Sequence, residues 1–211
     1  GILKENSLPG FKLNPLKPFV TKMRVVKSNS ELKMMRLAGK ISGRAYNQAY
    51  SKKFKTEKGL HSFLEYRFIN GGCEKSAYVP VVAGGDHALC IHYVRNDDVL
   101  RDGEMVLVDA AGQLGGYCSD ISRTWPNNGK FTPAQAEIYS LNDLHNLSVD
   151  WMTKELRNCG FSNLSNWETA KFLYPHYIGH NLGLDVHDCP SYSRSSPLVR
   201  GQVITIEPGV Y

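Results

Sequence analysis

The stretch EMVLVDAAGQLGGYCSDISRT, residues 104–124, decides both the fold and the chemistry expected of this chain. Its apolar run at 105–108 predicts a buried strand, so Asp109 places a carboxylate at the end of that strand. A charge in this position has to be paired or bound to a metal, because a lone buried carboxylate is costly. A Gly-Gly pair predicts a tight turn, after which a second strand at 117–124 brings Asp120 back beside Asp109. Two adjacent carboxylates repel each other unless a proton or a cation lies between them.

Three histidines and a glutamate later in the chain extend this set of candidate ligands. His176, His180 and His187 come first, and Glu207 follows the apolar run VITI at 203–206. His176 and His180 have the i, i+4 spacing of a helical zinc site, but the Pro and Gly residues around them favour short strands or loops. Two aspartates, a histidine and a glutamate suit a divalent metal ion bound by oxygen and imidazole.

Size and composition point to one globular domain. The chain has 211 residues, of which 42% are hydrophobic and 21% charged, as is typical of a soluble protein. No apolar run approaches the roughly 20 residues that span a bilayer, so no transmembrane segment is expected. The net charge is +5, with basic residues concentrated near the N-terminus, Lys27 among them. We interpret these as a solvated helical face; a nucleic-acid or anionic-membrane patch is the alternative. No zinc-finger spacing or RNA-binding signature supports it, so no nucleic acid is expected as a partner.

The cysteines indicate free thiols in a reducing compartment. There are five, scattered along the chain and without a C-x-x-C pair. Cys118 lies two residues before Asp120 and could act as a soft ligand, but such a cysteine is more often simply buried beside a site.

Local patterns predict an α+β domain at 25–211, preceded by an extended lead-in at 1–24. A capping box of Ser28 and Glu31 starts the first helix, and a second helix begins near Thr56 and ends at a Gly-Gly pair. The apolar stripe expected on the first helix consists of Met34, Leu37, Ala38, Ile41 and Ala45. The expected strands lie at 78–82, 88–93, 105–109 and 117–124, with short strands carrying His176, His187 and Glu207.

One local inconsistency concerns the middle of the chain. Thr132 followed by Pro is a strong helix start, yet only eight residues later Ser140 opens a second capping box. A helix of two turns that abuts a new N-cap is unfavourable. We therefore predict that residues are missing between Tyr139 and Ser140.

With these residues in place, the chain resembles the aminopeptidase P branch of the pita-bread metallopeptidases. The motifs that carry the resemblance run in family order and are AYVPVVAGG at 77–85, IHY at 91–93, MVLVD at 105–109, SDISRTWPN at 119–127, HYIGHNLGLDVHD at 176–188 and IEPG at 206–209. The resemblance implies a pita-bread catalytic domain at 25–211 that is incomplete at the C-terminus.

The resemblance also implies a ligand set. By position, Asp109 would chelate one metal ion, Asp120 would bridge two, and His180 and Glu207 would bind the second, while a final glutamate would lie beyond Tyr211. Two divalent ions are expected, with oxygen-rich ligation favouring Mn²⁺.

The remaining site residues are assigned to substrate and catalysis. Glu207 would accept a proton from the attacking water, His92 would lie near the amide nitrogen and His187 near the tetrahedral oxyanion. Tyr78 and His176 are expected on the substrate side, with His92 and His187.

Within the branch, the blocks at 109–118 and 174–177 are similar to the mitochondrial intermediate cleaving peptidases. This similarity implies removal of one bulky N-terminal residue (Tyr, Leu or Phe) from imported proteins after presequence cleavage. It also implies a mitochondrial location, in the matrix or associated with the inner membrane. A Xaa-Pro aminopeptidase is the alternative, and a metal-free scaffold on the same fold is the second. Peptide or protein N-termini are the expected partners, and a homodimer stays open.

Overall fold

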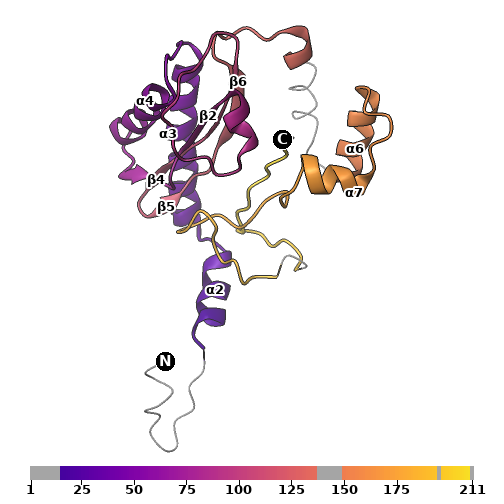
Figure 1. Ribbon diagram of the computed structural model, residues 1–211. Helices are drawn as coiled ribbons and strands as arrows, with labels where there is room; N and C mark the ends of the chain where they lie inside the picture. Colours follow the sequence, from indigo (N-terminus) through magenta and orange to yellow (C-terminus); the bar gives the residue numbers. More distant parts are fainter. Residues whose placement is uncertain (1–14, 137–148, 194–195, 210–211) are drawn as a thin grey trace, which may run out of the picture.

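The computed structural model describes residues 15–136, 149–193 and 196–209. Its main body consists of two long helices, α3 (Asn29–Tyr50) and α4 (Glu57–Asn70), beside two small antiparallel sheets (Figure 1). One sheet has the strand order β2 (Val81–Gly84), β3 (Met105–Asp109), β6 (Ser122–Pro126). The other has the order β1 (Lys75–Ser76), β4 (Gly112–Leu114), β5 (Tyr117–Cys118). The fold is therefore α+β, as the sequence predicts.

The sheet that leads to the candidate ligands has β3 (Met105–Asp109) at its centre. β3 pairs with β2 (Val81–Gly84) on one side and with β6 (Ser122–Pro126) on the other. In this register Asp109 lies opposite Ser122, two residues after Asp120. The predicted strand at 105–109 is confirmed, whereas the strand expected at 78–82 lies instead at Val81–Gly84.

Both predicted helix starts are confirmed. At the start of α3, Ser28 N–H donates to Glu31 Oε2 at 2.6 Å, and Ser28 Oγ accepts from Glu31 N–H at 3.4 Å. At the start of α4, Thr56 Oγ1 accepts from Gly59 N–H at 3.0 Å. These contacts satisfy backbone donors that a helix leaves unpaired at its N-terminus.

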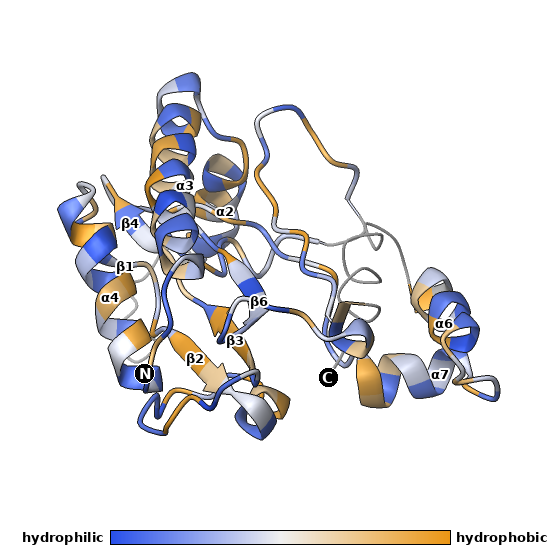
Figure 2. Cartoon of the chain, turned by 90° about the horizontal axis from the view of Figure 1, so that it is seen from above, coloured by the Kyte–Doolittle hydropathy of each residue, from blue (hydrophilic) through white to orange (hydrophobic). Residues whose placement is uncertain are grey.

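The core lies between α3, α4 and the β2-β3-β6 sheet, whose strands β2 and β3 are largely hydrophobic (Figure 2). It contains Ile41, Ala45, Tyr46, Leu60, Leu64, Phe68, Val82, Val106, Val108 and Trp125. Leu37, which was expected in the apolar stripe of α3, is 44% exposed, so that prediction is wrong; the buried face is turned toward Ser42 and Tyr46 instead.

The strand expected at 88–93 is also wrong. A 3-10 helix, η1 (Gly85–Leu89), occupies its first part, and turns follow in which Cys90 N–H donates to the His87 carbonyl. The physical reason is Glu57, a fully buried carboxylate that accepts hydrogen bonds from His87 and from the Tyr93 hydroxyl. These contacts curl the segment around one acceptor and prevent it from extending along a strand.

The single strand expected at 117–124 is divided in two. β5 (Tyr117–Cys118) pairs with β4 (Gly112–Leu114), which in turn pairs with β1 (Lys75–Ser76). β6 belongs to the other sheet. The chain crosses from one sheet to the other at residues 119–121, and Asp120 lies at this crossing.

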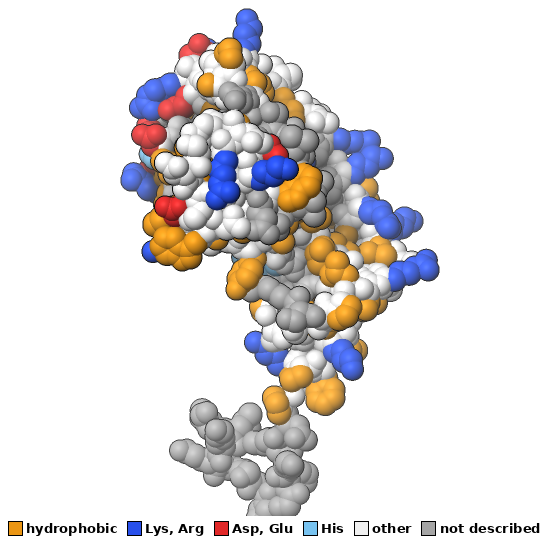
Figure 3. All heavy atoms as spheres, turned by 90° about the vertical axis from the view of Figure 1, so that its right-hand side faces the viewer, with side chains coloured by type: hydrophobic (Ala, Val, Ile, Leu, Met, Phe, Trp, Pro, Cys, Tyr) orange, Lys and Arg blue, Asp and Glu red, His pale blue; other side chains and the backbone are white. Residues whose placement is uncertain are grey.

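The segment before α3 corrects two further predictions. Helix α2 (Lys17–Val25), with Pro18 in its first turn, replaces the extended chain expected there. Lys27, expected on a solvated face, is buried and pairs with Asp188 at 3.1 Å. In Figure 3 hydrophobic side chains gather at the lower end, where α2 lies, whereas Lys and Arg are spread singly over that face of the molecule.

Three short elements lie apart from the sheets in Figure 1: α6 (Val149–Asn158), α7 (Asn166–Glu168) and the π-helical turn η2 (Thr169–Leu173). Met152 and Leu156 form a small cluster of their own with Leu173. The predicted helix start at Thr132 is confirmed by its reciprocal contacts with Gln135. The break predicted between Tyr139 and Ser140 lies outside the described residues.

Two further expectations concern chemistry and location. None of the five cysteines forms a disulfide, and Cys118 is buried, with its thiol near the carbonyls of Ala77 and Leu184. In the ranges that the structure describes, no helix is both long and apolar enough to cross a membrane.

Candidate metal centre

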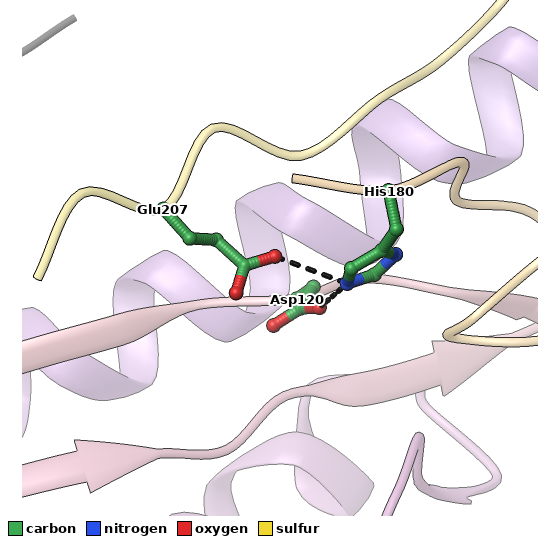
Figure 4. A group of neighbouring side chains, drawn as sticks. All are labelled: Asp120, His180 and Glu207. Carbon is green, nitrogen blue, oxygen red and sulfur yellow. Dashed lines mark ion pairs between the residues drawn. The ribbon is translucent and has the colours of Figure 1, made fainter. Parts of the chain in front are cut away.

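Asp120, His180 and Glu207 converge on one point (Figure 4). His180 Nε2 lies 3.4 Å from Asp120 Oδ2 and 3.0 Å from Glu207 Oε1. One ligand atom from each residue lies within 4.8 Å of the other two. In the described part of the chain this is the one group of three or more such side chains that could hold a metal ion.

His180 and Glu207 are brought together by two extended segments that pair in antiparallel fashion. Thr205 N–H donates to the His180 carbonyl at 2.9 Å, and Glu207 N–H donates to the Ile178 carbonyl at 2.7 Å. Gly179 is required at this pairing because a Cβ there would lie 2.0 Å from the Thr205 carbonyl oxygen. The short strands expected to carry His176, His187 and Glu207 are not formed, and isolated backbone pairings of Asn181 with Asp188 and Ile204 take their place.

The orientation of the His180 ring is fixed by its other nitrogen. Nδ1 lies 3.0 Å from the Asn181 carbonyl oxygen, which can only accept, so Nδ1 carries the hydrogen. In the neutral ring this leaves the Nε2 lone pair directed at the two carboxylates. Metal-binding histidines are commonly held in one tautomer in this way.

Asp109 lies outside this group of three and is connected to it through Tyr78. The Tyr78 hydroxyl lies 2.5 Å from Asp109 Oδ1 and 3.0 Å from Asp120 Oδ1. The prediction that Asp120 lies beside Asp109 is therefore confirmed. The Tyr78 hydroxyl, which was expected on the substrate side, lies between the two carboxylates.

The electrostatics of the group reflect two carboxylates around one imidazole, with the Asp109 carboxylate nearby. Burial and the charges of Asp120 and Glu207 raise the pKa of Asp109 to about 6, against the hydrogen bond from Tyr78. Burial disfavours a charged His180, but its contacts with Asp120 and Glu207 outweigh that effect and raise its pKa to about 10. The surroundings thus favour positive charge at the centre of the group.

The other predicted histidines lie around this group. The His187 ring meets the His180 ring edge to face, with centroids 4.4 Å apart. Burial, with the charges of His180 and His92, lowers the pKa of His187. His92 itself is exposed and has a positive φ of 60°. The His176 ring contacts the Tyr174 ring. Burial would raise the pKa of Glu207, but the hydrogen bond with His180 and, to a smaller extent, the charge of His176 lower it below its ordinary value.

Comparison with known proteins now gives the family. Residues 33–211 match the model of metallopeptidase family M24. The chain belongs to this family. It is 55% identical to intermediate cleaving peptidase 55 of Saccharomyces cerevisiae over 98% of the chain and 44% of that protein. It is 37% identical to Xaa-Pro aminopeptidase 3 of Mus musculus, over 95% of the chain and 44% of that protein.

The crystal structure of the yeast protein, Icp55, superposes on this M24 chain with a TM-score of 0.89, at 55% identity, over 94% of the chain and 55% of the solved structure. The aminopeptidase P branch and its pita-bread catalytic fold are thereby confirmed. The chain spans about half the length of these relatives.

The residues of this M24 chain fit the metal ions that the family name implies. The donor set consists of carboxylate oxygens and one imidazole nitrogen, which are the ligands of Mn²⁺ and similar divalent ions. Cys118 is not part of the group, so no thiolate biases the site toward softer ions.

Two buried acidic residues with distant partners were missed by sequence reasoning. The first is Glu57 in the first turn of α4, which accepts from His87 and Tyr93. The second is Asp188, whose buried side chain accepts from Lys27 and Arg24 directly beside His187. The sequence signal for each was only its position, Glu57 after the N-cap Thr56 and Asp188 after His187. Their roles could not be predicted because their partners lie far away in the chain.

Proposed function

We propose that the protein is a dinuclear metalloaminopeptidase that removes a single bulky residue, Tyr, Leu or Phe, from the N-terminus of imported proteins after presequence cleavage. The observation that carries this proposal is the convergence of Asp120, His180 and Glu207 beside Asp109. The choice among peptidases is supported by the 55% identity to intermediate cleaving peptidase 55.

In this proposal Asp109 would help to hold one ion, His180 and Glu207 would hold the second, and Asp120 would contribute to both. The Tyr78 hydroxyl, which lies between the two aspartates, holds their carboxylates in a fixed relation. Bound divalent ions supply Lewis-acid polarisation of the scissile carbonyl and lower the pKa of a water molecule. We expect Mn²⁺ because the ligands are mostly oxygen.

The chain's own groups then handle protons and position the substrate. Glu207 accepts the proton of the attacking water, and His187 donates a hydrogen bond to the developing oxyanion. His187 is suited to this role because its ring lies against that of His180. His92 would lie near the amide nitrogen, and His176 would contact the substrate beside Glu207.

The location and assembly of the protein are part of the same proposal. A mitochondrial site of action is supported by the relative named intermediate cleaving peptidase 55, mitochondrial, of Arabidopsis thaliana, at 37% identity. Peptide and protein N-termini are the proposed substrates. A homodimer is tested by light scattering of the purified full-length protein.

The substrate proposal is tested with peptides that begin Tyr-Ala, Leu-Ser and Arg-Pro, assayed with Mn²⁺. A pocket that buries a large apolar side chain should raise kcat/KM for the first two by about tenfold to hundredfold. Cleavage of the Arg-Pro peptide alone would favour the second candidate, a Xaa-Pro aminopeptidase, which the 37% identity to the mouse enzyme supports. Failure to cleave any of them, with no metal bound, would favour a scaffold.

A further inference from the structure

Helix α3 directs two buried hydroxyl groups at the strands that carry the aspartate ligands. Ser42 and Tyr46 are one helical turn apart on the same face of α3, with 0% and 2% of their surfaces exposed. Both lie on the helix face that packs into the core, where a polar group requires a specific partner. Their partners are backbone groups next to Asp109 and Asp120.

Tyr46 joins the two residues that directly follow the ligands. Its hydroxyl lies 2.7 Å from the Ile121 carbonyl oxygen and accepts from Ala110 N–H at 3.1 Å. Ala110 follows Asp109, and Ile121 follows Asp120. A hydroxyl has one hydrogen to donate and can accept as well, so a single oxygen can hold both segments at once.

Ser42 makes an equivalent connection on the other side of Asp120. Its oxygen accepts from Gly112 N–H at 2.9 Å and lies 2.9 Å from the Ser119 hydroxyl. Ser119 directly precedes Asp120 and donates to the Gly112 carbonyl at 2.9 Å. The crossing between β5 and β6 is therefore tied to α3 on both sides of Asp120.

We propose that Tyr46 and Ser42 are positioning residues that set the separation of the Asp109 and Asp120 carboxylates, and with it the affinity of the centre for its metal ions. Neither hydroxyl touches a carboxylate, so both act through the backbone. The inference rests on the ligand set proposed above. Groups that hydrogen-bond a metal ligand directly are worth about tenfold to hundredfold in metal affinity, and we expect an effect of the same order from these two hydroxyls.

The test is calorimetric titration of MnCl₂ into the metal-stripped full-length protein. Tyr46→Phe and Ser42→Ala each remove one hydroxyl and should weaken Mn²⁺ binding by about tenfold to hundredfold. Tyr93→Phe is the matched control, because Tyr93 is also buried and loses a hydrogen bond, to Glu57 at 2.8 Å, away from the ligand strands. It should bind Mn²⁺ as the wild type does.

Two further measurements separate positioning from general destabilisation and from an error in the ligand set. Urea unfolding of the metal-free variants should show similar losses for Tyr46→Phe and Tyr93→Phe, and the Co²⁺-loaded Tyr46→Phe protein should have a shifted visible spectrum. If Asp120→Asn abolishes Mn²⁺ binding while Tyr46→Phe and Ser42→Ala retain wild-type affinity, this inference is overturned and the ligand set stands. If Asp120→Asn binds as the wild type does, the ligand set itself is wrong.

Discussion

The proposed metal centre lies between two regions that are built differently. Asp109 and Asp120 belong to the region of helices and strands, where α3, α4 and the β2-β3-β6 sheet share one buried core. His180 and Glu207 lie on extended segments that isolated backbone pairings hold together. Several apolar side chains in this second region, such as Ile206, remain exposed, and its packing is a small cluster around Leu182 and Met35. The first region is thus held by one large core, whereas the second has a small apolar cluster and depends more on polar contacts.

The strongest of those contacts lie at Asp188. Its carboxylate, 1% exposed, accepts from Lys27 at 3.1 Å and also from Arg24. Beside it, Lys27 N–H donates to the Gly201 carbonyl at 2.8 Å, which ties the start of the Glu207 segment to the same place. The difference between the regions teaches that the second half of the site is held by one ion-pair cluster and a small apolar cluster, whereas the first half is held by an entire core.

The largest effect is expected where the two regions meet. Asp120→Ala removes the carboxylate that contacts both Tyr78 and His180. Loss of several kcal/mol of transition-state stabilisation should reduce kcat by about 10³-fold or more. Turnover and bound metal are measured on the same preparation. A normal rate with metal still bound would refute the dinuclear assignment.

A smaller effect is expected from the second region alone. His187→Ala should lower kcat by about 10²–10³-fold and change KM much less, because an oxyanion contact forms mainly in the transition state. Steady-state kinetics and metal analysis together test this. A fall in metal content would instead identify His187 as a ligand.

Asp188→Ala removes the ion pairs with Arg24 and Lys27 that hold the second region in place. This variant leaves Lys27 as a buried, uncompensated charge and should lower the free energy of unfolding by about 3–5 kcal/mol. Asp102→Ala is the matched control, because it removes an ion pair with Lys53 that lies at the surface; the Lys53 and Asp102 side chains are 61% and 65% exposed. This variant should have no measurable effect on the free energy of unfolding. Equal stabilities of the two variants in urea would contradict the role given to Asp188.

Within the first region a single polar contact should matter less. Burial disfavours the Glu57 carboxylate, but hydrogen bonds from two backbone amides, His87 and Tyr93 outweigh it and hold the pKa of Glu57 below its ordinary 4.5. A lowered pKa contributes stability that is present above the unfolded value and is lost as pH falls through the folded value. Glu57→Gln should therefore cost about 1–3 kcal/mol at neutral pH.

The pH dependence of that cost provides its check. The difference between wild type and Glu57→Gln should shrink as pH falls below 4.5. Contact with Glu57 raises the pKa of His87 above 6.5, so the part that His87 contributes is present below that pH and fades as pH rises. Urea unfolding across a pH series measures both. A difference that does not change with pH would exclude the charge of Glu57 as its cause.

Whether the sequence could predict an element depends on whether the contacts that form it are local or distant in the chain. The helix starts at Ser28 and Thr56 were predictable because each cap and its partner lie within three residues. The strand at 105–109 was predictable from its apolar run. The same reasoning failed at 88–93, where Glu57 contacts a segment about thirty residues away and no local pattern reveals the contact.

The candidate site shows the same limit. Motif resemblance picked out Asp109, Asp120, His180 and Glu207, and the structure places the last three together. The contacts that hold them could not be predicted, since Tyr46 reaches Ile121 and Lys27 reaches Asp188 across long stretches of chain. Lys27 was misread because a basic residue in a charged stretch is usually solvated.

The central claim is that both regions contribute ligands to one metal centre. Its most direct test is anomalous X-ray diffraction from crystals of the full-length protein loaded with Mn²⁺. The account predicts anomalous peaks bounded by Asp109, Asp120, His180 and Glu207, with Asp120 shared between two ions. Peaks elsewhere, or His180 still paired with Asp120 and Glu207 at saturating Mn²⁺, would contradict it.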